Sequence, residues 1–230
     1  MAKQSWRTKI DKIIAEEVEK SPLKKMRDNL LFFPISDQTM GFVSIYNQSS
    51  SKRALINVRL YILDFRLNYI FSQFYKDCRN LFANEFYFSL NTTSYRLPVM
   101  TVEQLELRDC DSEEVWRYNI SKLFASLERA IDSASQDFPS SKSISSFMRR
   151  PDQWQWPEYF VTLVLSGHVR EAMEDLIMKV REMEIRESQV FEWKDFKSRF
   201  DKWLIDGADI PNAAYARQFF LESVGRKDLI

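Results

Sequence analysis

The sequence predicts an α+β protein, in which an antiparallel sheet with flanking helices is followed by a helical C-terminal half. Apolar and polar residues alternate over residues 41–48 and 53–63, which is typical of strands with one buried face. From residue 112 onward apolar residues recur every three or four positions, which is typical of amphipathic helices. With 230 residues, 45% of them hydrophobic, the chain can bury a core without metals or disulfides.

The first elements follow directly from these periods. Residues 5–20 predict an amphipathic helix, and residues 23–29 a short turn. The apolar run at residues 30–35 contains Pro34 near its end, which favours an edge strand. Residues 41–48 and 53–63 both alternate, and the serine-rich segment between them predicts a hairpin.

Beyond the hairpin the period changes twice. Asp64 is placed to cap a helix over residues 65–82. Strands are expected at residues 85–91 and 97–107, and a long helix from Ser112 to just before Pro139.

The remaining chain predicts helices over residues 157–166, 169–183, 190–205 and 211–223. Gly167 and Gly207 stand where two of these helices should end. Residues 138–146, with five serines and a proline, are the best candidate for a linker. The expected organisation is an α+β domain at residues 1–138 and a helical domain or extension at residues 147–230, either separate or continuous.

Several classes of function are disfavoured by composition. The four glycines are scattered, whereas phosphate loops and dinucleotide fingerprints need two or three close together. One histidine and two distant cysteines do not make a common structural zinc site, so we expect no cofactor and no metal. Cys78 and Cys110 are expected as free thiols of a cytoplasmic protein, since no signal peptide or membrane span is evident.

The neutral total of 33 basic and 33 acidic residues hides an acidic segment at residues 103–114. Its acids, with only Arg108 between them, are Glu103, Glu106, Asp109, Asp111, Glu113 and Glu114. Three interpretations stay open: a solvated loop with a helix start, where acids are favourable, a docking surface for a basic partner, and a divalent-metal site.

Basic and aromatic residues alternate in a second region, where Arg59 and Arg66 lie near Tyr61 and Tyr69. Such interleaving is typical of surfaces that bind nucleic acid. Most of these aromatic residues, however, fall on an apolar helical stripe, and the pI of about 6.6 is low for phosphate binding. We therefore do not expect a nucleic-acid partner.

Three further features suggest chemistry or binding. Trp154 and Trp156 lie on a proline-bounded loop, where they either fill a joint between the two halves or anchor a partner. Glu192 and Lys194 match the end of a metal-dependent nuclease motif, but their apolar context is helical, whereas that motif needs a strand. His168 has no matched acid and nucleophile beside it in sequence.

The predicted hairpin, with Gln48 and Ser50 after one strand and Asn57 in the next, resembles an uncharacterised family of small bacterial α+β domains. The resemblance implies a bacterial accessory protein, associated with toxin-immunity systems, and carries over no catalytic residues.

Together these observations favour a non-enzymatic cytoplasmic binding protein, such as an immunity protein that blocks the active site of a basic toxin. Its expected partner-binding residues are the six acids of the segment together with Trp154 and Trp156. The alternatives are a metal-dependent nuclease or other hydrolase, and an adaptor subunit of a larger defence complex.

Overall fold

A computed structural model describes residues 5–27, 30–75, 97–148, 158–185 and 190–229. The chain divides into two compact units. The sheet unit comprises Met1–Ile35, Met40–Ile62 and Leu97–Asp137, and the helical unit comprises Ser36–Thr39, Leu63–Arg96 and Phe138–Ile230. The α+β class expected from the sequence is confirmed.

The sheet has five antiparallel strands in the order β1-β2-β3-β4-β5. Their bounds are Lys24–Arg27, Leu30–Pro34, Thr39–Ser49, Arg53–Asp64 and Leu97–Arg108. The expected alternation in β4 is confirmed, because every second side chain from Ala54 to Ile62 is fully buried. Ser50 N donates to Arg53 O at 2.8 Å and closes the expected hairpin.

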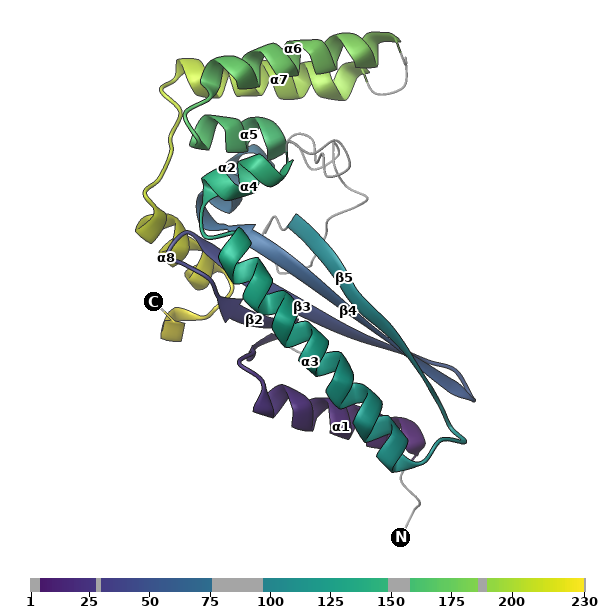
Figure 1. Ribbon diagram of the computed structural model, residues 1–230. Coiled ribbons are helices and arrows are strands. Elements are labelled where there is room, and N and C mark those ends of the chain that lie inside the picture. Colours follow the sequence, from purple (N-terminus) through teal and green to yellow (C-terminus); the bar gives the residue numbers. More distant parts are fainter. Residues whose placement is uncertain (1–4, 28–29, 76–96, 149–157, 186–189, 230) are drawn as a thin grey trace. The chain divides into compact units, whose positions relative to one another are not determined.

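Two helices of the sheet unit lie against the sheet, α1 at Trp6–Lys20 and α3 at Glu113–Asp137 (Figure 1). Ser5 caps α1 by accepting a hydrogen bond from Thr8 N, and Ile10 and Ile13 form its buried stripe. The buried stripe of α3 runs from Trp116 to Ala134. Both helices were expected at these positions.

Two expectations near the start of the sheet are wrong. Residues 24–27 form strand β1 instead of a turn, and β2 is consequently an inner strand instead of an edge. The first residue of β1, Lys24, lies opposite Phe32, so Pro34 lies beyond the paired part of β2. The missing N–H of Pro34 therefore leaves no hydrogen bond to β1 unmade. The strand was not predicted because β1 is short and mostly basic, with Met26 as its buried apolar residue.

Gly41 is required by a close approach within the sheet. It lies opposite Phe33 of β2, whose ring covers the glycine. A β-carbon at Gly41 would lie 1.9 Å from Phe33 Cζ, so no other residue fits without displacing the ring.

The helical unit begins where β4 runs directly into α2, Phe65–Tyr75. The capping role expected for Asp64 is confirmed, because its Oδ1 accepts a hydrogen bond from Leu67 N at 2.9 Å. The expected continuation to residue 82, together with the strand at 85–91 and Cys78, lies outside the described residues.

The expected linker at residues 138–146 is instead mostly helix. Ser141–Met148 form α4, and Phe138, Ser141 and Ile144 are buried. A run of serines is typical of a linker, and the sequence does not show which hydrogen bonds these serines make. At the start of α4, Ser140 and Ser143 form hydrogen bonds between the backbone of each and the side chain of the other.

The C-terminal helices are confirmed, with α5 at Glu158–Leu165, α6 at Val169–Ile185, α7 at Val190–Ile205 and α8 at Ala213–Ser223. Gly167 and Gly207 end α5 and α7 with φ angles of 83° and 96°, which favour glycine. Phe160 of α5 packs near Phe196 and Phe200 of α7, with ring centroids 6.2 and 6.4 Å away.

Candidate functional site

The acidic segment lies at one end of the sheet unit, where β5 passes through a tight turn into α3. Glu103 and Glu106 belong to β5, Asp109 and Asp111 to the turn, and Glu113 and Glu114 to the first turn of α3. The side chain of Glu103 is outside the described part of the structure. The other five acids are held in different ways, and the differences decide which of them can meet a partner.

Asp111 shapes the turn. Its Oδ2 accepts a hydrogen bond from Arg108 N at 3.0 Å, and its own N donates to Arg108 O at 3.2 Å. Asp109 N donates to Lys52 O at 3.1 Å, which ties this turn to the β3–β4 hairpin. The carboxylate of Asp111 therefore forms a hydrogen bond within the turn, whereas Asp109 takes part in the turn through its backbone N–H.

Trp116 anchors the start of α3. Its Nε1 donates to Arg108 O at 2.9 Å, and its ring lies 5.9 Å from that of Trp6 on α1. Ser112 Oγ accepts from Val115 N at 3.3 Å and caps the helix. These contacts join strand, turn and two helices into one frame.

Glu106 is shared between two arginines. Its carboxylate lies 3.8 Å from the Arg53 guanidinium and 3.4 Å from Arg108 Nε. Its negative charge is thus opposed by two positive charges on neighbouring positions of the sheet.

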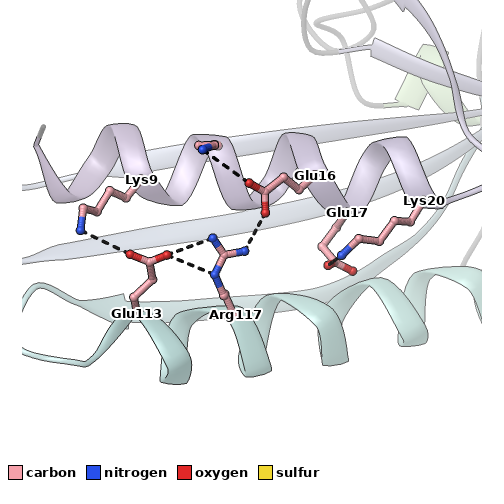
Figure 2. Close-up of polar contacts among 7 residues, drawn as sticks. Lys9, Glu16, Glu17, Lys20, Glu113 and Arg117 are labelled. Atoms are coloured by element: carbon pink, nitrogen blue, oxygen red, sulfur yellow. Dashed lines mark hydrogen bonds and ion pairs between the residues drawn. The ribbon is translucent and has the colours of Figure 1, made fainter.

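Glu113 points toward α1, although its side chain is still 41% exposed (Figure 2). It pairs with Lys9 at 3.3 Å and with Arg117 at 2.9 Å, and Arg117 also pairs with Glu16 at 2.6 Å. The hydrogen bond from Arg117 is the main cause that lowers the pKa of both Glu113 and Glu16 below their ordinary values. We call these four residues the interhelical ion network.

Two carboxylates of the segment, those of Asp109 and Glu114, have no partner among the described residues. Both are exposed, and on α3 they are accompanied by Val115, 43% exposed, and Tyr118, 70% exposed. Glu114 and Tyr118 are one helical turn apart and share a face. We call Asp109, Glu114, Val115 and Tyr118 the acidic docking face.

Tyr118 was not among the residues expected to bind a partner, although its sequence position carries a signal. It lies two residues from Trp116, about 200° around the helix, and so points away from the buried stripe. Val115 is 43% exposed, whereas its neighbour Trp116 lies on the buried stripe.

The other sequence candidates do not converge on this face. Trp154 and Trp156 lie outside the described residues. Glu192 and Lys194 lie in α7, so the lysine stands on a helix, as its context predicted. His168 is exposed between α5 and α6, with Nδ1 3.6 Å from Glu171.

The hairpin residues of the family resemblance have local roles. Ser50 Oγ accepts from Arg53 N at 3.3 Å within the turn, while Gln48 is exposed and Asn57 lies opposite Gln104 of β5. Within the described ranges, no three His, Cys, Asp or Glu side chains gather as a metal site would need. None of the described helices is both long and apolar enough to cross a membrane.

Comparison with protein-family models, with curated protein sequences and with solved structures finds no match to this chain.

Proposed function

We propose that this chain is a non-enzymatic binding protein that docks onto a basic surface of a protein partner through the acidic docking face. An immunity protein that covers the active site of a basic toxin is the form of this function that the family resemblance favours. The observation that carries the proposal is an exposed tyrosine one helical turn from Glu114, whose carboxylate, like that of Asp109 in the preceding turn, has no partner among the described residues.

Tyr118 has the properties of a binding anchor. Tyrosine is enriched among the residues that dominate binding energy, because a large ring with one polar tip buries much area at small entropic cost. At 70% exposed, this ring has most of its area available to a partner. Val115 extends the apolar area by its side.

Asp109 and Glu114 supply the charge around this anchor. Carboxylates at the rim of an interface attract a basic partner over distance and raise the association rate more than the final affinity. Within the described part of the chain neither of them has an ion-pair partner, unlike Glu106 and Glu113.

The frame beneath the face is preorganised. The bond from Trp116 to Arg108 O and the ion pair of Glu113 with Lys9 hold the start of α3 against β5 and α1. A rigid frame lowers the entropic cost of binding, which suits an inhibitor that must bind tightly. Cys110 in the same turn is an exposed free thiol, as is typical of proteins in the reducing cytoplasm, where we place this one.

The test is capture of a partner with the full chain from the native cytosol, followed by affinity measurement with the purified pair. We expect Asp109→Lys with Glu114→Lys to weaken binding at least about tenfold at low salt, chiefly through a slower association rate. Tyr118→Ala should also weaken binding about tenfold, but through faster dissociation.

The matched control is Asp132→Lys, which reverses an exposed charge further along α3. It should leave the affinity within about twofold, because a distant surface charge is screened. Unchanged binding by both the double charge reversal and Tyr118→Ala would show that the partner docks elsewhere.

A further inference from the structure

The face of the sheet turned away from α1 and α3 carries a second, differently charged surface. The fully buried side chains of β4 face the helices, so its alternate residues point outward. Asn47 of β3 donates to Asp11 of α1 at 2.8 Å, which places its neighbour Tyr46 on the outward side. We call the following residues the outward sheet face: Tyr46, Arg53, Leu55, Asn57, Arg59, Tyr61, Gln104, Glu106 and Arg108.

A cross-strand pair of like charges marks this face. Arg53 of β4 lies directly opposite Arg108 of β5, and both side chains are more than two-thirds exposed. Like charges in this position destabilise a sheet. Glu106, shared between them at 3.8 and 3.4 Å, offsets only one of the two charges. The fold gains nothing evident from the arrangement, whereas a polyanion would relieve it.

The rest of the face suits the other parts of a nucleotide. Arg59 is exposed and adds a third positive charge further along β4. Tyr46, 36% exposed, offers an aromatic ring on the neighbouring strand. Between the charges, Asn57 and Gln104 lie opposite each other and present amide groups that can both donate and accept hydrogen bonds.

We propose that the outward sheet face binds single-stranded nucleic acid. The three arginines contact backbone phosphates, Tyr46 stacks on a base, and the amides of Asn57 and Gln104 bond to base edges. Single strands are the class of polyanion that fits, because stacking on an aromatic ring requires an unpaired base.

The near-neutral charge of the whole chain does not oppose this proposal, since total charge does not report on one face. This face carries three arginines against one glutamate. It shares no residue with the acidic docking face, although Arg108 and Asp109 are adjacent in the chain, so either proposal can fail without the other.

The experiment measures by fluorescence anisotropy how tightly the full chain binds a fluorescein-labelled single strand of about 20 nucleotides. A strand of this length is longer than one binding site. We expect binding at about 50 mM salt, with a slope of log affinity against log salt of about −2, as three phosphate contacts predict. Changing Arg53, Arg59 and Arg108 together to Gln should weaken binding more than about tenfold and flatten this slope.

Tyr46→Ala should weaken binding about tenfold through loss of stacking and leave the salt slope unchanged. The matched controls are Tyr215→Ala and Arg129→Gln, which remove an exposed tyrosine from α8 and an exposed arginine from α3. Both should bind the oligonucleotide as the unchanged protein does. If the triple variant does not fold, Arg59→Gln alone should flatten the slope by about 0.7.

Four outcomes overturn the proposal. They are no binding at low salt, equal binding of a duplex of the same sequence, retention of affinity in the arginine variants, and heparin or polyglutamate binding as tightly with no effect of Tyr46→Ala. The last outcome would identify the face as a surface for polyanions or acidic proteins in general.

Discussion

The two units each contain a polar network that joins distant segments, but the networks differ in their exposure to water. In the sheet unit, the interhelical ion network joins α1 to α3 through side chains that are between a third and a half exposed. In the helical unit, Asp64 and Ser141 are each 1% exposed and bond to one another, and Arg66 Nη2 donates to Ser141 Oγ at 2.7 Å.

This difference in solvation predicts different energetic roles. Exposed ion pairs contribute little to stability, because water and salt screen them and ordering long side chains costs entropy. A buried polar group without its partner is costly, because nothing replaces the lost hydrogen bond. Asp64, Ser141 and the half-buried Arg66, which we call the polar trio, should therefore contribute most to the free energy of unfolding. The interhelical ion network should mainly set the orientation of α3.

The largest expected effect is that of Asp64→Ala. It removes the cap of α2 and leaves Ser141 and the N–H of Leu67 without an acceptor, so we expect a loss of about 3 kcal/mol in the free energy of unfolding. Chemical denaturation of the full chain measures this loss.

Asp64→Asn is the matched variant, since it keeps the shape and one acceptor oxygen. It should cost less than half as much as Asp64→Ala. Equal losses in the two variants, or a loss below about 0.5 kcal/mol for alanine, would contradict a role for the buried hydrogen bonds.

The pH dependence of stability should have opposite signs in the two networks. Burial raises the pKa of Asp64 above its ordinary value of 3.8, against the opposing effects of Ser141 and Arg66. Its contribution is complete below that value and is lost as the pH rises through the raised pKa. Glu113 has its pKa lowered from 4.5, so its contribution is present above that value and is lost as the pH falls through the lowered pKa.

Unfolding of the unchanged protein, Asp64→Asn and Glu113→Gln from about pH 3 to pH 8 checks this expectation. The stability difference between the unchanged protein and Asp64→Asn should decrease with rising pH. The difference for Glu113→Gln should increase. Curves of the same slope would mean that burial does not dominate at Asp64.

The smallest expected effect on stability is that of Arg117→Ala, although this residue bonds to both Glu16 and Glu113. We expect the melting temperature to fall by about 1–3 °C at low salt and the difference to vanish near 1 M salt, because the network is exposed. Arg129→Ala, on the same helix with one hydrogen bond to Ser126, is the control and should show no salt dependence. A large fall in melting temperature that persists at high salt would show that this network contributes as much to stability as the polar trio of Asp64, Arg66 and Ser141.

Local sequence rules predicted most of the fold correctly. The alternation of β4, the cap at Asp64 and the helix stops at Gly167 and Gly207 depend on a few neighbouring residues, and each was found where expected. The wrong predictions concern two elements whose structure depends on contacts with other segments and not on their own sequence pattern. β1 is a short strand that exists because β2 pairs with it, and α4 is a serine-rich helix whose buried residues are held by contacts with distant segments.

The candidate sites could be predicted only in part. The sequence shows six acidic residues within a segment of twelve. It does not show that Glu113 pairs with Lys9, 104 residues away, or that Glu106 pairs with both Arg53 and Arg108. It likewise does not show that Arg53 and Arg108 stand opposite each other.

By itself, therefore, the sequence determined the α+β class, most element positions and the location of the acidic segment, because periodicity and capping act over one or two helical turns. Tertiary structure alone decided which charges of the described residues are paired and which are exposed without an ion-pair partner there. The physical reason is that ion pairs and strand registers join residues far apart in the chain, and their geometry is set by the packing of the elements that carry them.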